Sequence, residues 1–139
     1  MKLKLILFIL IITCNFGFSQ TNFKKIYEYD TYRKDWALVE SNNGNFGFID
    51  RNGKVVVQTN YRKIDKFKYK NGDFALVQSF TGSYGLIDKN GKLIVNTIYA
   101  DIEDFGKIKK DWAVVKSIAG TFGCVDLKGN VVVLPVYKK

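Results

Sequence analysis

Hydrophobic and polar residues recur along the chain in a fixed order, and that order repeats every 38 residues without a gap. The first full copy opens with a short apolar segment, Trp36 to Glu40. It continues through two further segments rich in β-branched and aromatic residues, Phe46 to Asp50 and Lys54 to Val57. Turn-forming Asn and Gly residues separate these segments. Short runs of this composition between turn residues are typical of β-strands. The pattern therefore predicts an antiparallel meander of three strands in every copy.

Matching positions in the copies carry the same or closely related residues. The matching sets include Asp35, Asp73 and Asp111; Trp36, Phe74 and Trp112; Gly44, Gly82 and Gly120; Asp50, Asp88 and Asp126; and Gly53, Gly91 and Gly129. The N-terminal stretch keeps the phase of a linking segment, because Phe23, Ile26 and Tyr29 lie 38 residues before Tyr61, Ile64 and Phe67. We divide the repeat region into a half unit at 23–35 and units at 36–73, 74–111 and 112–137.

The repeat predicts the architecture. A period of about 20 to 50 residues indicates units that stack on their neighbours, since each is too small to bury its own apolar face. We expect an all-β fold built as an open tandem array of three antiparallel β-meander repeats that share one core. A closed threefold β-trefoil-like barrel is the alternative, in which the half unit pairs with the incomplete last unit. The segment from Tyr61 to Phe67 has large residues three positions apart, which fits either a turn of helix or an irregular strand.

The order of residues in each copy resembles the WG-repeat family, bacterial β-rich tandem repeats found in many exported proteins. Shared features are Ala-x-Val, Gly-x-aromatic-Gly-aliphatic-aliphatic-Asp, x-x-Gly-Lys, an aliphatic run and Tyr-x-x-Ile-x-x-Phe, over residues 23 to 137. The Trp-Gly pair of the family is replaced by Phe46-Gly47, Tyr84-Gly85 and Phe122-Gly123, and its proline by Gln58, Asn96 and Leu134. The resemblance implies a β-repeat fold but no activity, because it brings no catalytic residues to carry over to this sequence. Because such repeats occur in variable numbers, it favours the open array over the closed barrel.

The N-terminal residues have the plan of a secretory signal. Lys2 and Lys4 precede or enter an apolar run from Leu3 to Ile12, too short for a bilayer-spanning anchor, and Gly17 and Ser19 suit a cut before Gln20. We expect a signal peptide at 1–19 and a repeat domain at 20–139, in a periplasmic or extracellular protein with no transmembrane anchor after cleavage. Lipid attachment at Cys14 is the alternative, although Cys14 lacks the small preceding residue usual at such sites.

Composition excludes several chemistries. The 139-residue chain has no histidine, so Ser-His-Asp, Cys-His and His-based zinc sites are absent. The repeated aspartates at 50, 88 and 126 are interpreted as turn caps in preference to a calcium or acid-base site. The one tight acidic cluster suited to a glycan hydrolase, at 101 to 104, lies in a basic linking segment. We expect no enzyme, no cofactor and no metal.

Two further groups admit two interpretations. Cys124 stands at an apolar strand position, which predicts an inert core thiol in preference to a nucleophile. The large rings at 36, 74 and 112 could stack a sugar or base, but their alternation with Leu38, Leu76 and Val114 favours burial in the core.

Charge gives the one functional hypothesis. The full chain carries a net charge of +9, and loss of Lys2 and Lys4 leaves 20 basic residues against 13 acidic ones, a net charge of +7. Basic residues concentrate in the linking segments, where stacking would align them. The candidate ligand-binding residues are Arg62, Lys63, Lys66, Lys68, Lys70, Lys107, Lys109 and Lys110. They predict an anionic partner such as an acidic glycan, lipopolysaccharide or acidic protein, with nucleic acid less favoured. A structural envelope component with no specific ligand is the alternative.

Overall fold

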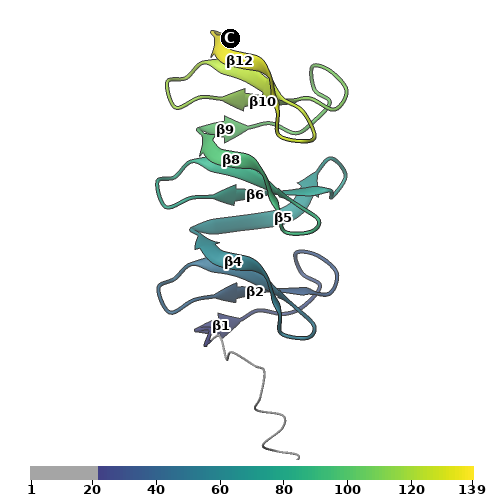
Figure 1. The fold of residues 1–139 in the computed structure, drawn as a ribbon, viewed down its shortest axis with the longest axis vertical. Coiled ribbons are helices and arrows are strands. Elements are labelled where there is room, and N and C mark those ends of the chain that lie inside the picture. Colours follow the sequence, from purple (N-terminus) through teal and green to yellow (C-terminus); the bar gives the residue numbers. More distant parts are fainter. Residues whose placement is uncertain (1–21) are drawn as a thin grey trace, which may run out of the picture.

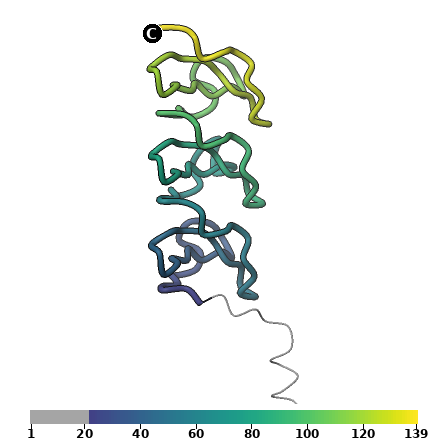
Figure 2. Tube along the Cα trace, turned by 60° about the vertical axis from the view of Figure 1, so that its left-hand side comes forward, coloured from purple at the N-terminus to yellow at the C-terminus, as the bar shows by residue number. Residues whose placement is uncertain are grey.

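The structure, a computed structural model, describes residues 22–139 and consists there of strands, turns and loops without a helix. The predicted leader at 1–19, with Cys14, lies outside the described residues. Twelve strands form three antiparallel sheets of four strands each, stacked along the long axis of the molecule (Figures 1 and 2). The first sheet contains β1 (Lys25–Ile26), β2 (Trp36–Glu40), β3 (Phe46–Asp50) and β4 (Val55–Tyr61). The second contains β5 (Lys63–Tyr69), β6 (Phe74–Gln78), β7 (Tyr84–Asp88) and β8 (Leu93–Tyr99). The third contains β9 (Asp101–Ile102), β10 (Ala113–Lys116), β11 (Phe122–Val125) and β12 (Val131–Tyr137).

This architecture confirms the all-β open array. In each sheet the strands pair in chain order, so every sheet keeps two edge strands and none closes into a barrel. The closed threefold barrel is therefore wrong. The N-terminal half unit supplies β1 to the first sheet and has no contact that would close a ring with β12 (Figure 1).

The linking segments contribute a fourth strand to each sheet. β5 pairs with β6, and its register places Ile64 opposite Val77 and Phe67 opposite Ala75, so that three steps on β5 match two on β6. Such a β-bulge adds one residue and turns two side chains three positions apart toward the same side. The spacing of Ile64 and Phe67 therefore comes from an irregular strand and not from a helical turn.

The hydrophobic core lies at the two junctions between sheets. We expected one shared core; instead, separate clusters join the first sheet to the second and the second to the third, and a small cluster lies within the first sheet. Trp36 is 8% exposed and packs against the rings of Phe48 and Phe67, with centroids 5.4 and 5.8 Å apart. Because strands such as β2 face a cluster on each side, their residues are buried along nearly the whole strand.

The aromatic-Gly pair of each copy has a steric cause. A side chain at Gly47, Gly85 or Gly123 would collide with the carbonyl oxygen of the neighbouring edge strand, at Val57, Val95 or Val133. The edge strand bulges toward the glycine at this point, because the pairing of β3 with β4 shifts register between Phe46 and Phe48. Glycine is required here for close backbone approach.

The repeated aspartates cap their turns, as predicted. Asp50 Oδ1 accepts hydrogen bonds of 2.9 Å from the backbone N–H groups of Asn52 and Lys54, and Asp88 and Asp126 repeat this arrangement. Burial alone would raise the pKa of Asp126, but hydrogen bonds from Asn130 and Lys128 and the Lys128 charge hold it below its ordinary value. These carboxylates are therefore occupied by the backbone.

Candidate functional site

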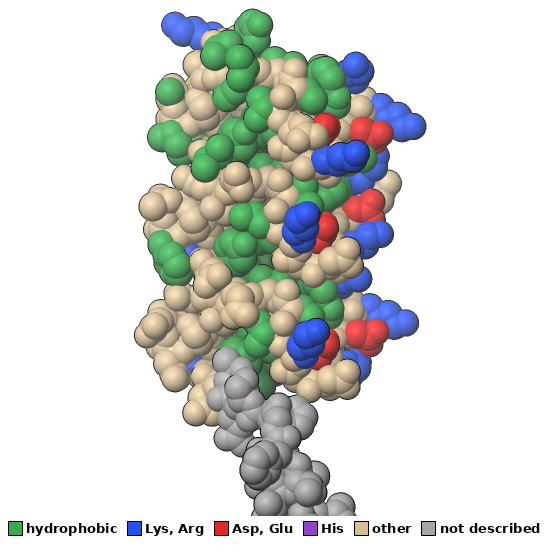
Figure 3. Space-filling model, in the orientation of Figure 1, with side chains coloured by type: hydrophobic (Ala, Val, Ile, Leu, Met, Phe, Trp, Pro, Cys, Tyr) green, Lys and Arg blue, Asp and Glu red, His purple; other side chains and the backbone are tan. Residues whose placement is uncertain are grey.

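Basic side chains gather along one long edge of the molecule, where acidic side chains lie among them at all three levels (Figure 3). Ion pairs neutralise part of this edge. Arg51 contacts Asp30 at 2.5 Å and Asp35 at 2.9 Å. Lys89 contacts Asp73 at 3.1 Å. These pairs are half exposed, so they orient the turns and contribute little to the free energy of folding.

The structure divides the eight predicted ligand-binding residues into two groups. Arg62, Lys63, Lys66 and Lys68 lie exposed on or beside β5, and Lys70 follows in the next loop. The second group, Lys107, Lys109 and Lys110, lies in the loop before β10.

Acidic residues separate the two groups. Asp101 lies on β9, and Glu103 and Asp104 follow directly after it. These three positions correspond to those of Lys63, Asp65 and Lys66 on β5. These carboxylates are engaged: Asp104 Oδ1 accepts hydrogen bonds of 2.7 Å from the backbone N–H groups of Lys70 and Phe105, and Glu103 contacts Lys107 at 3.8 Å and Lys139 at 3.2 Å. These contacts give the acidic cluster a structural role. The cluster also interrupts the predicted alignment of basic residues from one linking segment to the next.

Several lysines of the two groups have partners within the protein. Lys63 contacts Asp65 at 3.4 Å, and Lys70 forms an ion pair with Asp111. The Lys109 ammonium lies 4.2 Å from the centroid of the Trp112 ring, a cation–π contact. Among the described residues, no ion pair forms at Arg62, Lys66, Lys68 or Lys110. The charge most available to a ligand therefore lies along β5.

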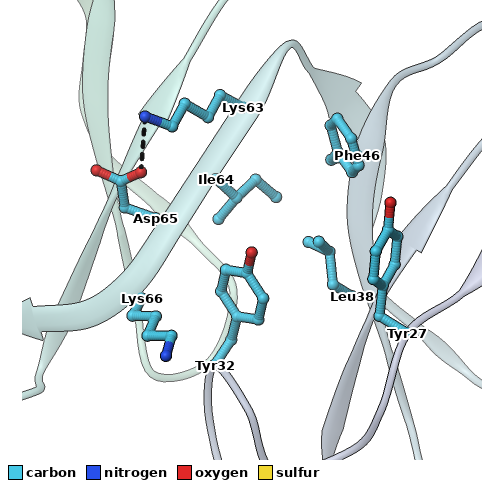
Figure 4. A pocket seen from close by; sticks show the side chains of 8 residues that line it. All are labelled: Tyr27, Tyr32, Leu38, Phe46, Lys63, Ile64, Asp65 and Lys66. Carbon is cyan, nitrogen blue, oxygen red and sulfur yellow. Dashed lines mark ion pairs between the residues drawn. The ribbon is translucent and has the colours of Figure 1, made fainter.

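A groove of about 270 Å³ opens beside β5, between the first and second sheets (Figure 4). One wall comes from the first sheet and its loops, the other from β5, so the groove crosses a junction. Tyr32 lies on the β5 side of the opening, facing Leu38, Phe46 and Tyr27 across it (Figure 4). The lining residues are Tyr27, Tyr32, Leu38, Phe46, Lys63, Ile64, Asp65 and Lys66.

Internal contacts fix the aromatic walls of the groove. The rings of Tyr27 and Phe46 lie 6.4 Å apart, and the Tyr32 ring meets Phe48 edge-on at 5.7 Å. The Tyr27 hydroxyl donates a 3.2 Å hydrogen bond to Glu40. Burial, followed by this bond to the Glu40 carboxylate, raises the pKa of Tyr27 above its ordinary value. The groove thus offers flat apolar surfaces beside hydroxyl and ammonium donors.

The sequence did not single out Tyr27 and Tyr32. Both belong to the N-terminal half unit, and the residues 38 positions later are Asp65 and Lys70. A departure from the repeat at both positions is the signal that would have found them. The lysine partners of this groove, Lys63 and Lys66, were among the predicted ligand-binding residues.

The corresponding region of the second junction has different chemistry. A cavity of about 330 Å³ there is lined by Tyr69, Ile102 and five charged residues, Lys68, Asp101, Glu103, Asp104 and Lys107. Burial, with smaller contributions from nearby carboxylates, raises the pKa of Tyr69 to about 12. Carboxylates predominate where the first junction has rings and lysines.

The other candidate residues lie in the core. Cys124 is buried, and burial raises the pKa of its thiol, as predicted for an unreactive cysteine. Trp36 and Phe74 are each 8% exposed, and the Arg33 guanidinium lies 4.8 Å from the Trp36 ring. These two rings are therefore core residues and not a ligand platform, whereas Trp112 is half-buried.

Two further features concern the described residues, 22–139. No group of three or more Cys, Asp or Glu side chains in this range is placed to hold a metal ion. The same range contains no helix long and apolar enough to cross a membrane.

Comparison with known proteins gives one match. The family model for the WG containing repeat matches residues 46–79 and 84–117, two adjacent copies of the 38-residue repeat. No curated protein and no solved structure matches the chain.

Proposed function

The chain belongs to the WG-containing repeat family, and from that premise we propose that it is an exported, non-catalytic module that binds an acidic glycan. Its family provides repeat-built binding or structural modules. The residues of the first junction support binding. The acidic ligand, the export and the absence of catalysis are parts of the proposal.

One observation carries it: the Tyr27, Tyr32 and Phe46 rings line the same groove as Lys63 and Lys66 (Figure 4). Aromatic rings pack against the apolar faces of sugar rings, and ammonium groups bind the carboxylates of uronic acids through charge-assisted hydrogen bonds. Asp65 adds an acceptor for sugar hydroxyls. A ligand that combines a flat apolar face with a negative charge fits this set better than either property alone.

A polymer fits better than a small anion because the basic residues continue beyond the groove. Arg62 and Lys68 are exposed at either side of the lysines that line it. A glycan chain held in the groove would run along β5 past both residues. Lipopolysaccharide and acidic protein share the negative charge, and nucleic acid shares charge and flat rings, so these ligands serve as comparison arms of the test.

The experiment compares binding isotherms on polygalacturonate with those on dextran, a neutral glycan. We expect saturable binding to polygalacturonate that weakens with salt, since exposed charges are screened over about 8 Å at physiological ionic strength. Lys63→Glu with Lys66→Glu should weaken binding about tenfold or more, equivalent to about 1.4 kcal/mol. Tyr32→Leu, which keeps an apolar side chain but removes the flat ring, should also weaken it.

A matched control makes the same change of charge elsewhere. Lys54→Glu with Lys92→Glu alters exposed residues on the β3–β4 and β7–β8 turns, away from the groove. Equal weakening by both double variants would show a diffuse charge effect and reject the groove. Tighter binding of DNA or lipopolysaccharide would replace the ligand class. If none of the polymers binds, the structural-component reading takes its place.

A further inference from the structure

The two junctions between sheets are copies of one interface. At the first, β2, β3 and β4 present one apolar surface, which we call the upper face after its orientation in Figure 1, and β5, β6 and β7 cover it with what we call the lower face. The upper face of the first sheet consists of Trp36, Leu38, Phe48 and Val57, and the lower face of the second consists of Ile64, Ala75, Val77 and Ile87. The second junction uses the same positions 38 residues later.

The backbones also meet in the same way at both junctions. The turn glycine of the sheet above lies against a carbonyl of the edge strand below. A Cβ on Gly91 would stand 2.6 Å from the carbonyl oxygen of Val56, and one on Gly129 would stand closer still to that of Ile94. Glycine at this position is therefore part of the interface as well as part of its turn.

At the bottom of the array, three of the four lower-face positions, Ala37, Val39 and Ile49, are buried within the first sheet, and the exposed position is Ile26. Ile26 is 54% exposed, whereas its equivalents Ile64 and Ile102 are 4% and 1% exposed. Gly53, the equivalent of Gly91, has no atom within 4 Å of a Cβ built on it, its own neighbours aside. The first sheet thus leaves open two contact positions of the interface, those of Ile26 and Gly53.

The top of the array has the matching upper face. Val133 is half-buried, whereas its equivalents Val57 and Val95 are buried. Tyr137 is 61% exposed, against 5% for Tyr99 one copy earlier. Val132, whose carbonyl corresponds to those that meet Gly91 and Gly129, is 38% exposed.

We propose that a second copy of this chain occupies the upper face, docking head to tail through its own lower face. The partner is a second copy because the complement of each open face is present at the other end of the same chain and is already used twice within it. Glu28 is exposed at the bottom, at the position where Asp104 accepts a hydrogen bond from the sheet below.

Such an interface joins two different surfaces, so a pair of docked chains still exposes one upper face and one lower face to further copies. The sheets within one chain stack along one axis without curving back (Figures 1 and 2). Repetition of a non-closing contact produces linear polymers. The protein should therefore form filaments of variable length that continue its own repeat, and should not form a dimer of fixed size.

The open space at Gly53 provides a sharp test. Its φ is +77°, a value that asparagine adopts more readily than other side chains, so Gly53→Asn should fold normally while placing a Cβ where the Val132 carbonyl of another copy would lie. Gly44→Asn is the control: Gly44 has a φ of +82° and equally open surroundings, but lies in the β2–β3 turn. Sedimentation velocity over a hundredfold concentration range, with the chain as its host processes it, measures the mass, and thermal unfolding verifies each fold.

We expect the wild-type chain and Gly44→Asn to shift toward species above twice the monomer mass as concentration rises, with Gly53→Asn remaining monomeric. Ile26→Lys, a change at an exposed residue, should have the same effect as Gly53→Asn. A wild-type chain that stays monomeric throughout would overturn the proposal. So would a dimer of fixed size, or association that Gly53→Asn leaves intact.

Discussion

The hydroxyl of Tyr69, on β5, donates a 2.8 Å hydrogen bond to the carbonyl oxygen of Ile102, on β9, within the buried junction between the second and third sheets. This bond has no counterpart at the first junction, because the residue 38 positions before Tyr69 is Thr31. It therefore joins one particular pair of sheets.

Removal of this hydroxyl should weaken the second junction. In Tyr69→Phe the buried carbonyl of Ile102 loses its donor, which we expect to lower the free energy of unfolding by about 1 to 3 kcal/mol. Urea denaturation measures the change. Tyr99→Phe is the matched control: Tyr99 is also buried, at 5% exposed, and no hydrogen bond from its hydroxyl is present in the described region. An equal loss in both variants would contradict a specific role for the bond.

Alkaline pH should act through the same residue. Burial, with nearby carboxylates, raises the pKa of Tyr69 to about 12 from an ordinary value of 10.0. A raised pKa means that the folded protein holds the proton more tightly than the unfolded chain. The stabilisation is complete below pH 10 and is lost as the pH rises toward 12. The free energy of unfolding should fall less steeply between pH 10 and 12 in Tyr69→Phe than in wild type; parallel curves would contradict the assignment.

Acidic pH should lower the stability of the protein through the aspartate turns. The pKa of Asp126 is lowered despite partial desolvation, because hydrogen bonds from Asn130 and Lys128 stabilise its carboxylate. Its contribution is present above the unfolded pKa and is lost as the pH falls through the folded value. Asp126→Asn should reduce the acid dependence of stability while keeping an acceptor oxygen. Asp88→Ala removes the acceptor and should cost about 1 kcal/mol at neutral pH. Unfolding measured from pH 7 downward tests both.

Burial of the repeated rings predicts a graded series. Trp36→Ala should lower the free energy of unfolding by about 3 to 5 kcal/mol, since it leaves a cavity in the core of the first junction. Trp112→Ala should cost less, because Trp112 is half-buried and its upper side has no covering sheet. Chemical denaturation of both variants gives the comparison. A larger loss at Trp112 would show that the C-terminal face is more tightly packed than its exposure indicates.

Most of the fold could be predicted from the 38-residue period and from the turn residues within it. Strand segments such as Trp36 to Glu40 and the capping role of Asp50 followed from local chemistry that the structure retains. The sequence left β5 open between a helical turn and an irregular strand, because a bulge gives Ile64 and Phe67 a spacing that a regular strand does not have. The sequence predicted one shared core, whereas the structure has a separate cluster at each junction. The difference arises because the middle sheet buries residues on both of its faces.

The groove was harder to predict than the fold because it belongs to no single repeat. The basic side chains of Lys63 and Lys66 could be predicted as ligand-binding residues from the sequence. Tyr27, just after β1, and Tyr32, in the loop before β2, could not. These tyrosines and lysines line one groove only because of the way the first sheet packs against the second. An alignment of the repeats does not contain that information. The partners of Glu103 and Asp104 were not predictable for the same reason, because they include Lys70 of the neighbouring sheet and Lys139 of the C-terminus.

The groove's position across a junction also bears on how such proteins diversify. The residues that line the groove come from two neighbouring copies, so duplicating or deleting one copy creates a new combination of walls without altering the scaffold. In this chain, one junction pairs tyrosines with lysines, and the next pairs a single buried tyrosine with carboxylates. Insertion of a repeat between them would change the side chains that line the groove in one genetic step, because each junction depends on a neighbouring pair of copies rather than on a single one.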